Sequence, residues 1–494
     1  MGVAITAPVP APARPSEVAV SQRPTARWRL VAYAYALVLG CVTSYFLFGI
    51  PIQLSDSFSN LLQIQGLPVS QVFVHELRGG GYLRPLLQVQ LKIVYDLARG
   101  DYFDWYRGIQ ALQVIGALLL TVRLLRIRTA SDAAAVPLCL AILLGIHTFT
   151  GTVREAFPIN TFLTLVLSCL AAACLAQSRG GRIVEVSSAL LLVFSLLTLE
   201  TGLLVWVVLV AAHLLRYPGT SRRAAITCTA IVAVYLLLRF VVLHVGTPGL
   251  TERSSGFGFS TLEPGELVAR FGANPLPFYT YNVASAALGL LFAEPRGGVW
   301  VFLRDFSQGA LQPWHVINVL SSALTTILIV YYVAQRLSAW RRGEISDSDR
   351  LVLLFLAILP ANAIFCLAYT KDVIMSPAGV FYALAAFAAF RQLIVTFPAA
   401  LSANRRAATA LLIAIVAAGW SVRLVGIHYL LRSTAGTVRT EWAFVDDWQE
   451  RNKVTIASPD QQQLKQTLYD DAIWRRPEPP HVALGWADRV FDTQ

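Results

Sequence analysis

The chain has 494 residues, of which 56% are hydrophobic and only 14% are charged. Soluble domains carry about 25% charged residues, so this composition excludes an ordinary soluble domain. The net charge of +11 does not indicate a nucleic-acid partner, because the basic residues gather in short loops between apolar blocks, as the orientation of a membrane protein requires. We therefore expect an all-α polytopic membrane protein that binds no nucleic acid.

Residues 1–28 are rich in Ala, Pro, Ser and Val. This composition is typical of a disordered segment, and we expect a cytoplasmic tail there. Apolar blocks of roughly 17–22 residues follow within residues 29–430, a length that crosses a hydrocarbon core about 30 Å thick. These blocks predict about eleven spanning helices, at residues 31–50, 109–125, 133–150, 158–176, 184–199, 201–215, 224–243, 317–336, 351–369, 376–394 and 407–426.

Clusters of arginine decide the predicted orientation. They are Arg23, Arg27 and Arg29; Arg123, Arg126 and Arg128; Arg179 and Arg182; Arg216, Arg222 and Arg223; Arg336, Arg341 and Arg342; and Arg405 and Arg406. With the N-terminus in the cytoplasm, every cluster falls on the cytoplasmic side, where basic loops are favoured. We therefore predict a multi-pass protein of the cell inner (plasma) membrane, with a cytoplasmic N-terminus and an extracytoplasmic C-terminus.

Three long segments lie on the predicted outer side. Residues 51–108 form a first outer loop that carries amphipathic helices, residues 244–316 form a later outer loop, and residues 431–494 form an outer C-terminal tail. The later loop contains an apolar stretch at 277–293. We expect this stretch to lie at the membrane interface, because a further span there would move the later arginine clusters outside.

Three acidic residues at the predicted outer face need an explanation, because charge near a membrane is costly. Asp56, in GIPIQLSDSFSNLL, follows the first span and either caps the next helix or takes part in chemistry. Glu155, in GTVREAFPIN, lies beside Arg154, so a local ion pair is the alternative to a functional role. Glu200, in LLTLETGLLVW, has no basic neighbour in the sequence, which indicates a distant partner in a polar network.

Basic residues on the same side complement these acids. Arg84 lies in GGGYLRPLL, Lys371 lies in AYTKDVIMSP, and Arg304 lies in the later outer loop near His315. One interpretation is that these side chains extend to lipid headgroups. The other is that they supply cations for the phosphate of a lipid-linked substrate.

Four segments, in this order along residues 31–430, resemble motifs of the GT-C type glycosyltransferases. They are YLRPLLQVQLKIVYDLARGDYFDWYRGIQALQVIGALLL, GTVREAFPINTFLTLVLSCLAAACLA, LLLVFSLLTLETGLLVWVVLVAAHLLR and LPANAIFCLAYTKDVIMSPAGVFYALAA. The resemblance extends to protein O-mannosyltransferases, transmembrane-TPR mannosyltransferases and similar bacterial membrane proteins. The chain departs from their pattern in having only Asp56 where the family often has paired acids, and in having Tyr106 and Arg107 near the position of a missing histidine.

The resemblance implies a GT-C fold and an inverting transfer of sugar, on the outer face, from a polyprenyl-phosphate sugar to a hydroxyl group of a glycan, lipid or protein acceptor. The resemblance implies that Asp56 and Glu155 are the catalytic pair. Arg84, Lys371 and Arg304 would bind the donor phosphate. Glu200, Arg154 and His315 would hold the acceptor or these cations. The lipid-linked donor and membrane lipids are the expected partners. No metal site is predicted, because no second close acid accompanies Asp56.

Two other functions fit parts of the sequence. A polymerase or ligase of lipid-linked polysaccharides would use a late outer loop such as the one with Arg304 and His315. A transporter or flippase of lipid-linked glycans would show paired repeats and charges at mid-membrane. The clearest charge inside a predicted span is Arg239, and the sequence shows no paired halves. The acid that follows the first span favours the glycosyltransferase.

Overall fold

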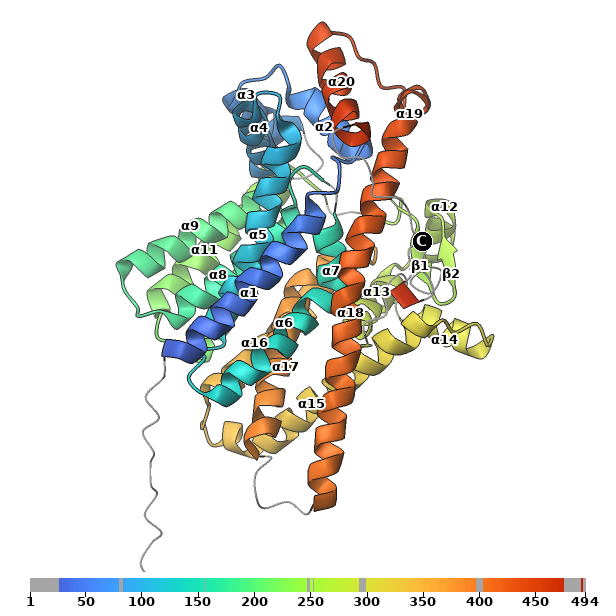
Figure 1. Cartoon of the computed structure of the whole chain (residues 1–494). Helices are drawn as coiled ribbons and strands as arrows, with labels where there is room; N and C mark the ends of the chain where they lie inside the picture. The colour runs from blue at the N-terminus through green and yellow to red at the C-terminus, as the bar shows by residue number, and fades with distance from the viewer. Residues whose placement is uncertain are drawn as a thin grey trace, which may run out of the picture.

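A computed structural model shows a protein built almost entirely from helices (Figure 1). The structure describes residues 26–79, 83–155, 157–246, 249–251, 253–292, 299–396, 403–474 and 490–491. Within these ranges the chain forms twenty α-helices and one two-stranded sheet. The N-terminal tail was predicted to be disordered over residues 1–28; residues 1–25 lie outside the described residues, and residues 26–28 belong instead to the first helix.

The first helices form a packed pair and a cap above it. They are α1 (Ala26–Leu47), α2 (Ser55–Ile64), α3 (Val69–Gly79), α4 (Pro85–Ala98) and α5 (Tyr102–Leu124). α1 packs along α5, while the amphipathic helices α2, α3 and α4 occupy the connection between them, within the predicted first outer loop. Buried Arg107 on α5 secures this connection, because it donates hydrogen bonds to the carbonyls of Ile50 and Pro51, both at 2.7 Å.

The middle of the chain adds α6 to α11, and the segment predicted as a span over 133–150 is bent. The elements are α6 (Ala130–Gly145), α7 (His147–Arg154), α8 (Thr161–Gln177), α9 (Arg182–Thr198), η1 (Glu200–Gly202), α10 (Leu203–Leu214), α11 (Arg222–Leu237) and the π-helical turn η2 (Leu238–Val242). The angle between α6 and α7 is 63°. The segment predicted as a span over 133–150 therefore consists of two helices that meet at an angle.

The later outer loop contains the sheet. Its elements are β1 (Ser255–Phe257), β2 (Ser260–Leu262), α12 (Pro264–Phe271), α13 (Leu276–Phe292) and α14 (Val299–Ser307). β1 and β2 pair antiparallel, and Gly258 in their turn has φ +61°, which glycine adopts without steric cost. α13 coincides with the stretch predicted at 277–293. Its 17 residues extend about 26 Å, less than the hydrocarbon thickness of about 30 Å.

The last third of the chain contains the central helix and the longest one. The elements are α15 (Pro313–Arg341), α16 (Asp347–Ile364), η3 (Asp372–Met375), α17 (Ser376–Thr396), α18 (Ala403–Ala443), α19 (Val445–Arg451) and α20 (Pro459–Ile473). α17 is buried along its apolar length. α18 runs for 41 residues without a break. The domain boundary predicted between residues 430 and 431 therefore falls inside a helix, and the C-terminal segment leaves the helix only after Ala443.

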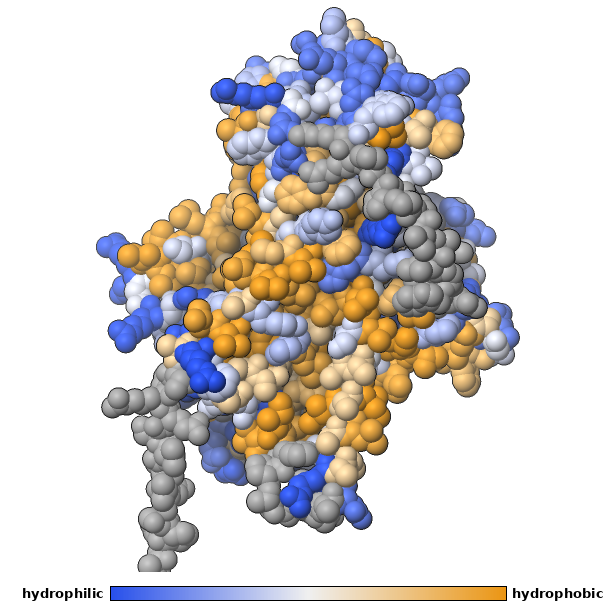
Figure 2. Space-filling view, viewed as in Figure 1, coloured by the Kyte–Doolittle hydropathy of each residue, from blue (hydrophilic) through white to orange (hydrophobic). Residues whose placement is uncertain are grey.

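Long apolar helices show that this is a membrane-embedded protein. Among the described residues, six helices are long and apolar enough to cross a membrane, or seven if α6 and α7 form one bent span. Figure 2 shows apolar residues over the middle of the molecule and hydrophilic residues over the end that carries α2 and α20. Each of the eleven predicted spans overlaps a helix, but the count of eleven spans stays a prediction.

Arginine residues from different parts of the chain form ion pairs at one end of the helix bundle. Arg126 and Arg128, which follow α5, lie 2.9 and 3.2 Å from the carboxylate of Asp347 at the start of α16. Arg391, near the end of α17, pairs with Asp132 at the start of α6. These ion pairs join the ends of four helices, so the basic loops beside them lie on one side of the protein.

A buried arginine accounts for the break between α6 and α7. Ile146 is extended, with φ −72° and ψ 130°, so carbonyl groups at the end of α6 lose their helical partners. Arg423 on α18 donates from Nε to the Gly145 carbonyl at 2.9 Å. The same guanidinium donates to the hydroxyls of Ser321 and Ser322 at 3.0 and 2.9 Å. The break is therefore stabilised by a side chain that lies far away in the sequence.

The substitution Arg423→Met is expected to destabilise the fold. The buried Gly145 carbonyl would lose its donor, which costs about 1–3 kcal/mol. The midpoint of thermal unfolding in detergent should fall accordingly. Arg406→Met removes an exposed arginine from the same helix and is the matched control, which should leave the midpoint nearly unchanged. Equal midpoints for the two variants would show that Arg423 does not stabilise the break.

Candidate functional site

Close packing fixes the position of α7 against the start of α17. The Ser376 hydroxyl donates to the Thr148 carbonyl at 2.9 Å and contacts the Thr152 hydroxyl. Gly379 permits this approach, because a Cβ at that position would lie 2.3 Å from Thr148 Oγ1. Buried Asn362 on α16 forms hydrogen bonds to the backbone on both sides of the junction between η3 and α17. The residues just before α17 are therefore held in place relative to α7.

One ion pair and one contact between a histidine ring and a carboxylate join these residues to the two ends of α7. Lys371 Nζ lies 3.1 Å from Glu155 Oε1, and Asp372 Oδ1 lies 3.8 Å from His147 Nε2. His147 is the first residue of α7, and Glu155 follows its last. The His147 side chain is only 9% exposed, and its Nδ1 has no hydrogen-bond partner among the described residues. A buried ring nitrogen without a protein partner is available to a ligand.

These pairs border a cavity of about 460 Å³, which we call the hairpin cavity. Its walls come from the β1–β2 hairpin, α13, α14, α7 and the segment that precedes α17. The ionisable residues that line it are His147, Arg304, Lys371 and Asp372. Hydroxyl groups line much of the rest, from Thr148, Ser254, Ser255, Ser260, Thr261, Tyr281, Ser285 and Thr370. The hairpin cavity therefore combines cations with many hydroxyl groups.

Aromatic contacts hold the hairpin over this cavity. The backbone N–H of Gly258 donates to the Tyr281 hydroxyl at 2.9 Å. The Tyr281 ring stacks on Trp300, with 5.7 Å between centroids, and Phe259 meets the other side of this pair at 6.3 Å from Trp300. Since Tyr281 is on α13 and Trp300 is on α14, both helices anchor the hairpin.

A second charged group borders the hairpin cavity. Arg304 Nε lies 2.9 Å from Asp305 Oδ1, and His315 Nε2 lies 3.4 Å from Asp305 Oδ2. The Arg304 side chain is 40% exposed, whereas the His315 side chain is buried. Asp305 therefore holds Arg304 from behind while its guanidinium remains open to the cavity.

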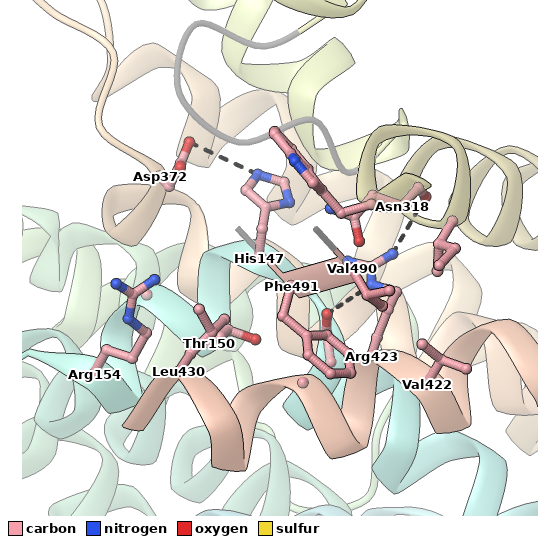
Figure 3. A pocket seen from close by; sticks show the side chains of 15 residues that line it. His147, Thr150, Arg154, Asn318, Asp372, Val422, Arg423, Leu430, Val490 and Phe491 are labelled. Atoms are coloured by element: carbon pink, nitrogen blue, oxygen red, sulfur yellow. Dashed lines mark hydrogen bonds and ion pairs between the residues drawn. The ribbon is translucent and has the colours of Figure 1, made fainter. Parts of the chain in front are cut away.

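A smaller cavity of about 140 Å³ adjoins the hairpin cavity, and we call it the α18 cavity. Both cavities include His147 and Asp372 in their linings. α7, α15 and α18 supply most of its other residues, among them Arg154, Asn318 and Arg423 (Figure 3). Arg154 donates from Nε to the Thr434 hydroxyl at 3.2 Å. The His147–Asp372 pair therefore stands between two cavities.

The structure brings together five of the eight site residues inferred from the sequence. Lys371 and Arg304 line the hairpin cavity, and Arg154 lines the α18 cavity. Glu155 contacts Lys371, and His315 contacts the acid that pairs with Arg304. Residues that lie up to 217 positions apart in the sequence, from Arg154 to Lys371, thus surround one pair of cavities.

Asp56 is not part of this group. Its side chain is exposed in the first turn of α2, and it is absent from the linings of both cavities. Figure 1 shows α2 beside α20 in the cap, apart from the hairpin. An acid in the first turn of a helix interacts favourably with the helix dipole. The prediction that Asp56 caps this helix is nevertheless wrong, because α2 begins at Ser55 with Leu54 at its N-cap, and Asp56 does not line the cavity that contains Lys371.

Glu200 and Arg84 form a separate cluster. Arg84 donates from Nε to both carboxylate oxygens of Glu200, at 3.0 and 2.8 Å. Buried Arg239 on η2 approaches the same carboxylate at 3.4 Å. The distant basic partner inferred for Glu200 is thus confirmed, and two arginines, Arg84 and Arg239, take this role. Arg84, inferred as a ligand of the donor phosphate, instead contacts this acid.

The sequence interpretation missed three residues of the site. His147 and Arg423 lie inside or beside predicted apolar blocks, where a polar side chain is itself a signal of function or of a buried partner. Asp372 follows Lys371 directly but received no role of its own. The sequence did not reveal the contact between His147 and Asp372, because these residues are 225 positions apart.

Comparisons with known proteins give no family for this chain. No family model matches it, and no curated protein shows significant similarity to it. Function must then be argued from the site itself. Within the described ranges, no group of three His, Cys, Asp or Glu side chains is arranged to hold a metal ion.

The substitution Glu200→Gln is expected to destabilise the protein strongly. Breaking a buried ion pair leaves an uncompensated charge at a cost of about 3–5 kcal/mol, here on Arg239, which is 4% exposed. Glu344→Gln is the matched control, since Glu344 pairs with Arg342 at the surface, where solvent screening leaves such a pair little effect on stability. Unfolding in a denaturant series should separate the two variants. Similar midpoints would show that the cluster has no stabilising role.

Proposed function

We propose that this protein is a membrane glycosyltransferase of the GT-C type. It moves a sugar from a polyprenyl-phosphate donor to an acceptor hydroxyl on the extracytoplasmic side of the membrane. The observation that carries this proposal is the hairpin cavity, in which Lys371 and Arg304 lie with the His147–Asp372 pair and a set of hydroxyl side chains. The four sequence motifs that resemble GT-C enzymes support the same reaction.

The hairpin cavity suits the head of a lipid-linked sugar. Its volume of about 460 Å³ lies within the range of about 300–1,000 Å³ found for small-molecule sites. Lys371 and Arg304 offer cations to a phosphate, and serine, threonine and tyrosine hydroxyls offer donors and acceptors to the sugar. Exposed apolar residues of neighbouring helices such as α13 supply a surface for the polyprenyl chain.

The reaction needs a base on one face of the sugar and cations on the other. The acceptor oxygen forms a bond to the anomeric carbon while the bond from that carbon to the phosphate oxygen breaks, which inverts the centre. Asp372 takes the hydroxyl proton. Lys371 and Arg304 stabilise the negative charge of the departing polyprenyl phosphate. We assign the base to Asp372 in place of Asp56, because Asp372 lines both cavities and Asp56 lines neither.

Other residues position these groups. Glu155 holds the ammonium group of Lys371 at 3.1 Å, and Asp305 holds Arg304 at 2.9 Å. His147 Nε2 lies 3.8 Å from the Asp372 carboxylate, and both residues line both cavities. These contacts reduce the motion of each charged group before the substrates bind, which is the basis of electrostatic catalysis.

The arrangement of charges also supports the proposed orientation. Ser376, near the hairpin cavity, and Arg391, in the arginine network, lie about 22 Å apart along α17. The cavity and the basic loops are therefore at opposite ends of the central helix. With the basic loops in the cytoplasm, the eleven-span topology puts the hairpin cavity on the outer side, where polyprenyl-phosphate sugars are used by GT-C enzymes.

The substitution Asp372→Asn is expected to reduce sugar transfer by about 10²–10⁴-fold, because it removes the general base. The assay uses membranes containing the protein and a labelled polyprenyl-phosphate sugar. Asp56→Asn is the matched control, since it makes the same chemical change on the exposed face of α2, and should retain the wild-type rate. Full activity of Asp372→Asn, or loss of activity in Asp56→Asn, would reverse the assignment of the base.

One observation favours a second candidate, a ligase of lipid-linked polysaccharides. The Arg304–Asp305–His315 group lies in the late loop that such enzymes use. The two candidates differ in their donors, because a ligase would take an oligosaccharide from a polyprenyl diphosphate.

The donors separate these candidates directly. Labelled monosaccharyl polyprenyl phosphate and labelled oligosaccharyl polyprenyl diphosphate are supplied to the same membranes in parallel. We expect transfer from the monophosphate donor, because the hairpin cavity offers room for a small sugar and two cations for one phosphate. Transfer from the diphosphate alone would establish the ligase instead.

A further inference from the structure

The α18 cavity has one polar wall and one apolar wall. His147, Thr150 and Arg154 line it and follow one another at intervals of three and four residues, so they share one face of α7. Opposite them, α18 contributes apolar residues at four-residue intervals, Val422, Gly426 and Leu430, together with Arg423, whose guanidinium is bound to the Gly145 carbonyl and to two serine hydroxyls. The cavity therefore suits a group that is polar on one side and apolar on the other.

Each cavity has its own pair of cations, and those of the α18 cavity are Arg154 and Arg423. Lys371 and Arg304 line the hairpin cavity alone, whereas Asp372 lines both cavities. A sugar bound by its phosphate in the hairpin cavity would thus have the α18 cavity on the other side of Asp372. An inverting transfer requires the acceptor oxygen to arrive on the side opposite the leaving phosphate.

Two described residues near the end of the chain form part of the wall of the α18 cavity. Val490 and Phe491 line it, and Figure 3 shows the Phe491 ring between His147 and the helix that carries Arg423 and Leu430. Gly426 makes room for the ring, because a Cβ at that position would lie 2.7 Å from a Phe491 ring carbon. The Tyr429 ring lies 5.6 Å from the Phe491 ring.

We propose that the α18 cavity is the acceptor site and that Phe491 occupies it in competition with the acceptor. The inference rests on the proposed function and adds a residue that regulates access to it. The acceptor carries its hydroxyl group beside an apolar group, because the polar wall of α7 faces the apolar wall of α18 across the cavity. The acceptor binds only when Phe491 leaves, so the fraction of open molecules reduces its apparent affinity.

The occupancy of the cavity can be tested without any substrate. Thr150 is buried in the lining of the α18 cavity, so Thr150→Cys reports access to the cavity by its rate of reaction with N-ethylmaleimide. The full-length protein is studied in detergent, with Cys41→Ala to remove the exposed natural cysteine. Adding Phe491→Ala should speed the labelling by about tenfold, because a docked segment protects the groups beneath it.

The control for this labelling is Trp474→Ala. Trp474 is 70% exposed, and its removal should leave the rate of Thr150→Cys labelling unchanged. If Phe491→Ala also leaves the rate unchanged while both proteins melt at the same temperature, Phe491 does not close the cavity and the inference is wrong.

Hydrolysis of the donor tests whether the position of Phe491 affects the reaction. With labelled polyprenyl-phosphate sugar and no added acceptor, water can attack the anomeric carbon, give its proton to Asp372 and release free sugar. Phe491→Ala should raise this release several-fold over the wild type, and Trp474→Ala should not. A fall in sugar release with Phe491→Ala would show that Phe491 helps the reaction. It would contradict the proposal that Phe491 competes with the acceptor.

The two measurements separate the possible failures. If neither the wild type nor any variant releases or transfers sugar, the proposed function fails, and the acceptor assignment fails with it. Faster labelling in that case would still establish that Phe491 closes the α18 cavity. Unchanged labelling together with normal transfer would overturn the role of Phe491 alone.

Discussion

The hydrogen bond from Arg423 to the Gly145 carbonyl is the contact on which the site depends. A helix that crossed here without a break would carry α7 onward in the direction of α6 and away from α17. The break leaves carbonyl groups without intrahelical partners in an apolar setting, where such groups are costly. Arg423 satisfies one of them at 2.9 Å and bonds to two serine hydroxyls of α15 as well. One side chain therefore couples α6, α15 and α18 at the base of the site.

α7 acts as a short platform between two cavities. Its first residue faces Asp372, the residue after its last faces Lys371, and the hydroxyls of α17 bind its middle. Small residues make this possible, since Gly379 lets α17 approach Thr148 more closely than an alanine would allow. The acidic and basic groups of the proposed reaction are thus positioned by packing of rigid helices rather than by a loop.

Hydropathy and charge were sufficient to predict much of the fold. Apolar blocks predicted the positions of the helices, and the arginine clusters predicted which loops lie together, because both signals are local in sequence. The break at Ile146 escaped prediction because its cause, Arg423, lies 278 residues away from Gly145. The length of α18 escaped it because hydropathy marks where a helix leaves the lipid and not where the helix ends. The same limit applies to the site: Lys371 and Arg304 were selected by type, but Asp56 was preferred to Asp372 since sequence order does not reveal which acid lies beside them.

The unbroken course of α18 has a mechanical consequence. A helix of 41 residues is about 62 Å long, roughly twice the hydrocarbon thickness of a bilayer. Near its far end, Trp442 donates from its indole nitrogen to the Ile52 carbonyl at 2.6 Å and packs on Phe58 of α2. The length of α18 therefore fixes the height of the cap above the helix bundle and the rotation of the cap about the axis of α18. One inserted residue between Gly426 and Trp442 would raise the cap end of the helix by about 1.5 Å and turn it by about 100°. The number of residues in this part of α18 therefore determines where the outer half of the protein lies.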